Sequence, residues 1–391
     1  MPHPVRDTPE NPAFYLNPRP QPLEEFLPGA HDPRDFHRQL PGYAPTPLCE
    51  APGIARRLGV AQLWVKDESS RLGLPAYKIL GASWATWRAL TERLGLAPAA
   101  SGLEELRARL AGAGPLELVA ATDGNHGRAV ARVARWLGIG AHILVPQDMS
   151  AARVEAIQAE GARVTRVSGS YDDAVEAAAR QQGPSRVVIA DTAWPGYERV
   201  PGWVVDGYAT LFLEADAALA AAGAPPPDLV LVQVGVGSLA AAAVKHYRRP
   251  AGHTRVVAVE PTRAACLLES LRAGRLTEVP GPHDSVMAGL NCGRPSPLAW
   301  PLLQRSLHAA VAIPDRRTEQ AVRLLAGEGI RSGESGAAAL GGLLELLEGP
   351  WAERARSALE IGPQTRVLVI STEGPTDPAA YARSLGPEQG R

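Results

Sequence analysis

The sequence predicts an α/β protein with two open, mostly parallel, twisted sheets and an active site between them. Two observations support this fold class. Short apolar segments alternate with helix-forming segments over residues 116–190 and again over residues 228–372. This alternation is typical of βαβ units, in which helices cover both faces of a parallel sheet. In addition, polar or glycine-rich motifs follow four of the apolar segments, and open α/β sheets bind ligands at the carboxyl ends of their strands.

The length and composition of the chain indicate an ordinary globular protein. The 391 residues suffice for two modest domains with sizeable cores. A content of 45% hydrophobic and 21% charged residues is ordinary for a globular protein, and a net charge of −1 favours neither nucleic acid nor an anionic membrane as a partner. Three cysteines are too few for a disulfide framework. Because no apolar run reaches the length of a membrane span and no secretory signal is visible, we expect a cytoplasmic protein.

The first elements along the chain lead to a single lysine. We expect an extended arm over residues 1–45 and a short helix over residues 53–59. A strand over residues 62–66 and an acidic-polar loop over residues 67–70 should follow. Residues 75–83 then open a helix, so Lys78 lies close to a helix N-terminus. The helix dipole and partial burial would both lower the pKa of its amine there. A neutral lysine amine can form a Schiff base with an aldehyde and later act as a base, although an exposed lysine in an ordinary first turn is the simpler interpretation of this segment alone.

The first run of alternating segments contains two acidic candidates. We expect strands over residues 116–121, 138–146, 162–167 and 186–190, with helices over 128–137, 151–160 and 171–181. After the first strand, Asp123 is placed where a base could act, and Asn125 could hydrogen-bond a phenolic oxygen of a ligand. Asp191 follows the last strand in an aromatic run, where an acid between apolar surfaces could hold an ammonium group. Taken locally, a helix cap and an exposed turn explain these residues as well.

The second run of alternating segments supplies a possible phosphate site. We expect a rigid connector over residues 225–227 and strands over 228–234, 254–260 and 367–372. The first of these strands ends in a loop of Gly235, Val236, Gly237 and Ser238, which opens an alanine-rich helix. Glycines, the free N–H groups of a helix N-terminus and the Ser238 hydroxyl can together bind an anion. The loop lacks the lysine of a P-loop and the third glycine of a dinucleotide site, so a monophosphate suits it best; a tight strand-to-helix turn is the alternative.

The order of the elements predicts the domain organisation. Residues 81–199 form a smaller α/β domain that is inserted into a larger one. Residues 1–80, including the N-terminal arm, and residues 200–391 together form the larger, cofactor-binding domain.

A lysine, a monophosphate loop and an asparagine at one sheet edge together indicate pyridoxal 5′-phosphate (PLP) as cofactor, with no metal. The aldehyde of PLP needs Lys78, its phosphate needs the loop 235–238, and its ring oxygen needs a neutral partner such as Asn125. Ser371 or Thr372, at the end of the last predicted strand, could supply a hydroxyl to the ring nitrogen. A hydroxyl partner leaves this nitrogen largely unprotonated, which favours elimination over transamination.

The ordering of these motifs resembles the tryptophan synthase β-like, fold-type II group of PLP-dependent enzymes, and more narrowly the diaminopropionate ammonia-lyases. The runs that show the resemblance are residues 77–83, 121–127, 191–198, 287–293, 332–337 and 371–377. Asp123 and the run 191–194 discriminate within the group, because threonine dehydratases and racemases usually have a small serine or glycine at the position of Asp123. Tyr77 departs from the family's usual phenylalanine, and the phosphate loop is leaner than the tetraglycine of other members.

The resemblance implies α,β-elimination of 2,3-diaminopropionate, as the D- or L-isomer, to pyruvate and ammonia. Lys78 would bind PLP and remove the Cα proton of the L-isomer, Asp123 would act on the D-isomer from the opposite face, and Asp191 would hold the β-ammonium group. Both acids should then lie in poorly solvated surroundings. Related enzymes are homodimers, and we expect the same here. Cys266 and Cys292 lie on two loops of the larger domain, where the thiols either pair or stay free and buried.

Two alternatives remain open at this point. One is another PLP reaction on the same fold, such as serine or threonine dehydration or amino-acid racemisation, against which Asp123 and Asp191 argue. The other is an amino-acid-binding regulatory protein without catalysis, against which the joint presence of Lys78, Asn125 and Ser238 argues. A nicotinamide dehydrogenase does not fit, because the glycine loop is too short and no ribose-binding acid follows a first-strand loop.

Overall fold

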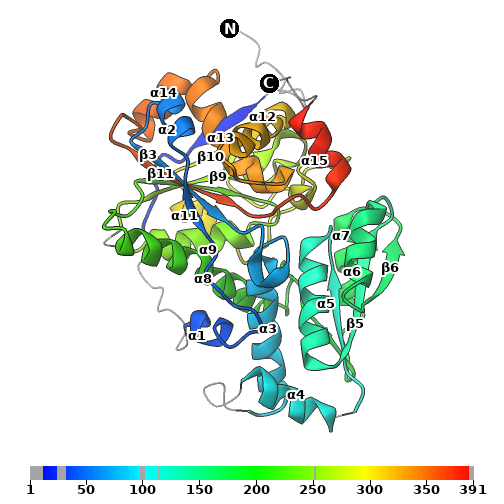
Figure 1. Cartoon of the computed structure of the whole chain (residues 1–391). Coiled ribbons are helices and arrows are strands. Elements are labelled where there is room, and N and C mark those ends of the chain that lie inside the picture. Colours follow the sequence, from blue (N-terminus) through cyan, green and yellow to red (C-terminus); the bar gives the residue numbers. More distant parts are fainter. Residues whose placement is uncertain (1–11, 24–31, 97–101, 113, 251, 387–391) are drawn as a thin grey trace.

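The larger of two sheets lies among helices in the upper part of the molecule, apart from the smaller sheet (Figure 1). The computed structural model describes residues 12–23, 32–96, 102–112, 114–250 and 252–386. Within them the larger sheet has seven strands in the order β1-β10-β9-β8-β11-β3-β2. These strands are β1 (Ala13–Leu16), β2 (Leu48–Glu50), β3 (Gln62–Asp67), β8 (Leu229–Gln233), β9 (Arg255–Pro261), β10 (Ala309–Ile313) and β11 (Arg366–Ser371). The five central strands are parallel, whereas β1 and β2 run antiparallel at the two edges.

The smaller sheet comes from one continuous stretch of chain. Its four strands are parallel, in the order β6-β5-β4-β7. They are β4 (Glu117–Ala121), β5 (Gly140–Pro146), β6 (Arg163–Val167) and β7 (Arg186–Val188), and they alternate with the helices α5 (Asn125–Leu137), α6 (Ala151–Gln158) and α7 (Tyr171–Ala179). The prediction of an α/β fold with two open, mostly parallel sheets is therefore confirmed.

Helices cover both faces of the larger sheet because its strands are apolar on both sides. In β8, Val230 and Val232 pack into one core cluster, while Leu229 and Leu231 pack into the other. Successive side chains of a strand point to opposite faces, so a strand buried on both faces is apolar throughout. One face carries α2 (Pro52–Leu58), α12 (Asp315–Gly327), α13 (Glu334–Glu348), α14 (Ala352–Ala358) and α15 (Pro378–Leu385). The other carries α8 (Arg199–Ala221), α9 (Ser238–Tyr247), α10 (Cys266–Ala273) and α11 (Trp300–Ser306).

The helix α3 (Lys78–Arg93) connects the two sheets. It packs against α8 beside the larger sheet and against α5 on the smaller one, and α4 (Leu103–Ala111) lies at its far end (Figure 1). Two glycines let α3 and α8 approach closely: a Cβ on Gly81 would lie 2.5 Å from the Tyr208 ring, and one on Gly207 would lie 2.6 Å from the Leu80 carbonyl oxygen. Because one core cluster runs through this contact, the domain boundaries at residues 80 and 200 remain a prediction.

The N-terminal region contains more regular structure than an extended arm. Residues Ala13–Leu16 form β1 and pair with β10, and Pro33–His37 form the short helix α1. Residues 1–11 and 24–31, which belong to the same predicted arm, lie outside the described residues. None of the helices in the described ranges combines the length and apolar character that crossing a membrane requires.

Four charged side chains are buried together beneath the loop that leads to Lys78. The Lys66 Nζ and Arg71 Nη2 atoms lie 2.8 and 2.7 Å from the Glu214 carboxylate. Arg71 also lies 2.6 Å from Glu68. Each of the four side chains is at most 4% exposed. Burial would raise the pKa of Glu214, but Arg71 and Lys66 outweigh it and lower that pKa to about 2. Two positive and two negative charges therefore balance inside the protein.

Replacing Arg71 with methionine should destabilise the fold by about 3–5 kcal/mol, because two buried carboxylates lose their shared partner. The matched control is Arg57→Met, which breaks a surface pair with Glu348 at 2.8 Å and should cost at most about 1 kcal/mol. Urea denaturation of both variants measures the difference in the free energy of unfolding. Equal losses in the two variants would contradict a structural role for the buried cluster.

Candidate active site

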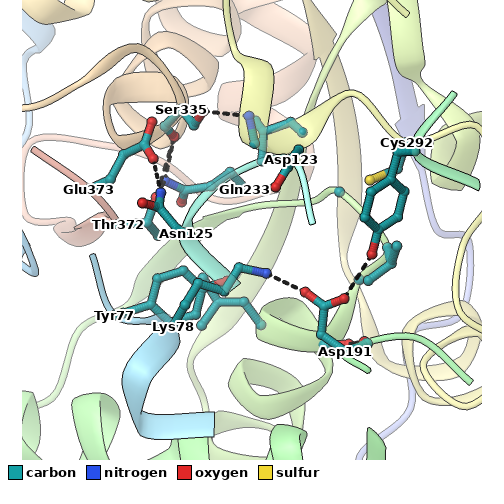
Figure 2. Close-up of a pocket in the computed structure, with 18 residues that line it drawn as sticks. Tyr77, Lys78, Asp123, Asn125, Asp191, Gln233, Cys292, Ser335, Thr372 and Glu373 are labelled. Carbon is teal, nitrogen blue, oxygen red and sulfur yellow. Dashed lines mark hydrogen bonds and ion pairs between the residues drawn. The ribbon is translucent and has the colours of Figure 1, made fainter. Parts of the chain in front are cut away.

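A single cavity brings the predicted site residues together at the carboxyl ends of strands from both sheets (Figure 2). Lys78, Ser238 and Thr372 come from the segments after β3, β8 and β11 of the larger sheet, and Asp123 and Asp191 follow β4 and β7 of the smaller sheet. The lining is Tyr77, Lys78, Asp123, Asn125, Tyr171, Asp191, Gln233, Gly235, Val236, Gly237, Ser238, Leu239, Gly289, Leu290, Cys292, Ser335, Thr372 and Glu373. Of the predicted site residues only Ser371 is not part of it.

Lys78 and Asp191 form an ion pair inside this cavity. The Lys78 Nζ donates to Asp191 Oδ2 at 2.6 Å, and the Asp191 side chain is 6% exposed. Burial would lower the pKa of the Lys78 amine, but the Asp191 carboxylate outweighs it and raises that pKa well above its ordinary value. The expectation of a lowered lysine pKa is therefore wrong for this arrangement. The pKa is raised because the fold brings the Asp191 carboxylate, 113 residues away in the sequence, next to the lysine amine.

Asp191 is held from several sides. Its Oδ1 accepts a hydrogen bond of 2.9 Å from the Tyr171 hydroxyl, and its backbone carbonyl accepts one of 2.6 Å from Ser238 Oγ. Burial would raise the pKa of Asp191, but the Lys78 ammonium outweighs it, so the pKa lies well below its ordinary value. Asp191 is thus a fixed, anionic carboxylate at neutral pH, which suits a group that binds an ammonium ion.

Asp123 has the opposite electrostatic character. It lies directly before α5 in the wall of the cavity, partly buried. Burial raises the pKa of its carboxyl group, and the nearby Asp191 charge adds to this while Lys78 opposes it. A carboxylate with a raised pKa is a stronger base than an ordinary aspartate. Both acids lie in poorly solvated surroundings as expected, but only Asp123 has the raised pKa that a general base needs.

Asn125, the first residue of α5, is oriented by Glu373 (Figure 2). The Asn125 Nδ2 donates to Glu373 Oε2, which uses one of its two hydrogens. Glu373 is 4% exposed, and burial raises the pKa of its carboxyl group. The second Asn125 hydrogen has no acceptor among the described residues, in agreement with a role in binding a ligand oxygen.

The loop Gly235–Ser238 has the form of an anion site. Gly237 adopts φ +97° immediately before α9, and the backbone here leaves five consecutive N–H groups, those of residues 235–239, without an acceptor among the described residues. The same five residues line the cavity. Free N–H groups at a helix N-terminus, together with the helix dipole, bind phosphate groups well. The loop therefore fits the phosphate of PLP.

Replacing Gly237 with alanine should weaken PLP binding about tenfold, because the left-handed conformation costs an alanine ~1–2 kcal/mol and the loop would shift to relieve it. The added Cβ would also lie 3.0 Å from Leu303 Cδ1. Gly223→Ala is the matched control, since Gly223 has φ +67° after α8 with no atom within 4 Å of the added Cβ. Fluorescence titration of the cofactor-free proteins with PLP measures the affinities. The same affinity in both variants would contradict the assigned phosphate site.

The two hydroxyl residues after β11 are placed differently. Thr372 lines the cavity and is 4% exposed. Ser371 is not part of the cavity lining and donates a 2.8 Å hydrogen bond to Ser332 Oγ. Of the two candidates for the ring nitrogen, the structure therefore favours Thr372.

The sequence interpretation assigned no site role to several lining residues. Tyr171, Gln233, Ser335 and Glu373 each contact a predicted site residue or its backbone. Gln233 lies near the end of one predicted strand and Glu373 directly follows another. Their position at the carboxyl edge of the sheet could therefore have indicated a place in the site. Cys266 and Cys292 are free thiols in the structure, and both contact the region of Gly235. No cluster of three metal-binding side chains occurs within the described part of the chain.

Comparison with known proteins agrees with this geometry. Residues 39–373 match the family model described as "pyridoxal-phosphate dependent enzyme". The diaminopropionate ammonia-lyase of Salmonella typhimurium is 36% identical over 367 residues, which cover 90% of each chain.

Two crystal structures of the Escherichia coli diaminopropionate ammonia-lyase are similar over the whole fold. The complex with D-serine superimposes with a TM-score of 0.87 at 34% identity, covering 96% of this chain and 97% of the other. The complex with an aminoacrylate–PLP azomethine reaction intermediate gives a TM-score of 0.86 at 33% identity, with the same coverage.

Proposed function

Since this chain belongs to the diaminopropionate ammonia-lyase family of PLP-dependent enzymes, we propose that it eliminates ammonia from 2,3-diaminopropionate to give pyruvate. The observation that supports this substrate most directly is the anionic Asp191 carboxylate, held in the same cavity as Lys78. With one water, one molecule of this diamino acid yields one pyruvate and two ammonia. We further propose that the protein is a cytoplasmic homodimer, as its family resemblance implies.

The residues of the cavity fit PLP. The phosphate would be held by the free N–H groups of residues 235–239, the aldehyde carbon by Lys78, the ring oxygen by Asn125 and the ring nitrogen by Thr372. When bound, the cofactor withdraws electrons from the substrate Cα and so makes its proton removable. The protein supplies binding, orientation and the groups that move protons.

We assign removal of the Cα proton to two groups, Lys78 at the start of α3 and Asp123 in the turn between β4 and α5. Lys78 would accept it at Nζ from the L-isomer, and Asp123 would accept it at its carboxylate from the D-isomer. Lys78 comes from the larger sheet and Asp123 from the smaller one, and Figure 2 shows their side chains entering the cavity from different sides. This separation supports a two-base assignment.

Asp191 connects substrate recognition to the basicity of Lys78. A lysine paired at 2.6 Å with a carboxylate stays protonated and cannot act as a base. Once Lys78 is free of the cofactor, a β-ammonium group of the substrate would compete for the same carboxylate. The Lys78 ammonium that loses this partner would give its proton to water and become a neutral base. Serine has a hydroxyl at this position and carries no charge with which to compete. The pair therefore favours diaminopropionate over serine and threonine.

The test is an assay of pyruvate release from D- and L-2,3-diaminopropionate by the PLP-loaded protein, with L-serine and L-threonine in parallel. We expect kcat/KM for diaminopropionate to exceed that for serine at least about 10²-fold, since a buried charged site strongly rejects a substrate without the matching group. The absorption band of bound cofactor shows separately that the protein is loaded. A loaded protein that prefers serine or threonine would move the function to the dehydratases.

A further inference from the structure

One buried amide in the cavity has no role in the function proposed above. Gln233, the last residue of β8, is 3% exposed and lines the cavity. Its Nε2 lies 2.9 Å from the Ser335 carbonyl oxygen, 3.1 Å from that of Gly336 and 3.0 Å from that of Ile370. Carbonyl oxygens only accept hydrogen bonds, so the amide nitrogen must face them, and its two hydrogens are shared among these carbonyls and any further acceptor within reach.

The same nitrogen determines the direction of the Thr372 hydroxyl (Figure 2). Gln233 Nε2 lies 2.8 Å from Thr372 Oγ1. Because the amide donates, the threonine oxygen accepts, and the hydroxyl hydrogen has to point elsewhere. Its one acceptor among the described residues is the Ser335 carbonyl oxygen at 3.5 Å, the outer limit of a hydrogen bond. The hydrogen is therefore available to an acceptor inside the cavity.

We propose that Gln233 is a positioning residue that fixes the Thr372 hydroxyl as a hydrogen-bond donor to the ring nitrogen of bound PLP. The proposal rests on the proposed function only for the identity of the cofactor. A pyridine nitrogen that accepts this hydrogen bond remains unprotonated and withdraws electrons less strongly. Negative charge would then be concentrated near Cα, which favours departure of the β-ammonium group as ammonia, and transamination would be a minor side reaction.

The direct test is the nitrogen-15 resonance of ring-labelled PLP bound to the wild-type protein and to Gln233→Met. Methionine has a similar volume but no N–H donor, so Thr372 is free to rotate toward Ser335. We expect an unprotonated, hydrogen-bonded ring nitrogen in the wild-type protein and a clearly shifted resonance in the variant. The matched control is Gln181→Met, which removes an amide whose Oε1 lies 2.9 Å from His142 Nδ1 in the smaller sheet, and its resonance should equal that of the wild type.

A double-mutant cycle on PLP affinity shows whether the two residues act together. Gln233→Met and Thr372→Val should each weaken PLP binding by about three- to tenfold, the effect of one hydrogen bond. The PLP affinity of the double variant should lie within about twofold of that of the single variant with the lower affinity. Both changes remove the same contact, so their effects should not add. Thr372→Ser keeps the hydroxyl and should retain the wild-type resonance. If Gln233→Met does not fold, as judged by thermal unfolding, Gln233→Asn keeps the amide but is too short to reach Thr372.

Two outcomes would overturn the proposal. One is an unchanged ring-nitrogen resonance in both Gln233 variants. The other is a protonated ring nitrogen in the wild-type protein, since Thr372 would then have to accept rather than donate. Neither measurement needs substrate, so a failure of this proposal is distinguishable from a failure of the proposed reaction.

Discussion

Lys78→Ala will reduce pyruvate release from either isomer of 2,3-diaminopropionate by more than about 10⁴-fold, because it removes the group that binds the cofactor covalently as well as one of the two bases. A lactate dehydrogenase assay of pyruvate measures this loss. The variant should still bind PLP through the phosphate loop, but reversibly, so that gel filtration removes the cofactor.

The chain offers a simple control for this experiment. Its only lysines are Lys66, Lys78 and Lys245. Lys245→Ala changes a lysine on α9 that pairs with Asp206 at 2.5 Å, outside the cavity lining, and it should keep wild-type activity. Borohydride reduction of the loaded wild-type protein followed by peptide mapping should label Lys78 and neither of the others. Labelling of Lys66 or Lys245 instead would refute the assignment.

Asp123→Asn will reduce kcat/KM for the D-isomer by about 10²–10⁴-fold, which is the usual contribution of a general base. The L-isomer should lose less than about tenfold, because its proton goes to Lys78. Steady-state kinetics on the pure isomers separate the two effects. If D-isomer turnover stays intact while L-isomer turnover falls, the assignment of the two bases is wrong.

The pH dependence of the same reaction gives an independent check. Burial raises the pKa of Asp123, so this carboxyl group remains protonated to a higher pH than an ordinary aspartate. A base works only when deprotonated, and kcat/KM for the D-isomer is therefore full above the raised pKa and falls as the pH drops through it. The acid limb should lie clearly above pH ~3.9, the ordinary aspartate value. The L-isomer profile should lack this limb.

Most of the fold follows from local patterns in the sequence. The βαβ alternation over residues 117–188 is readable because apolar strands and helices are short and alternate regularly. In contrast, β1 was not predicted, because its four residues, Ala13–Leu16, lie in a proline-rich stretch and become a strand only by pairing with β10. Its stability comes from a tertiary contact, which local propensity cannot show.

The candidate site shows the same division. Lys78, Asn125 and the loop 235–238 are readable because each follows a strand and opens a helix. The pKa of Lys78 could not be predicted, because the direction of its shift depends on Asp191. Only the fold brings the Asp191 carboxylate within 2.6 Å of the lysine amine. Gln233 was read as part of an apolar strand, and its importance depends on carbonyl groups from α13 and β11. Charge pairing and hydrogen-bond direction are thus properties of the assembled cavity.

The Lys78–Asp191 pair also sets an order of events for cofactor assembly. An ammonium group held by a carboxylate has no free electron pair and does not attack aldehydes. The phosphate of PLP could dock at the N–H groups of residues 235–239 without any change at the lysine, so we expect docking to precede covalent attachment. Because Asp191 raises the pKa of the Lys78 amine, we expect the loss of one proton from Lys78 to limit attachment and holoenzyme formation to accelerate as the pH rises.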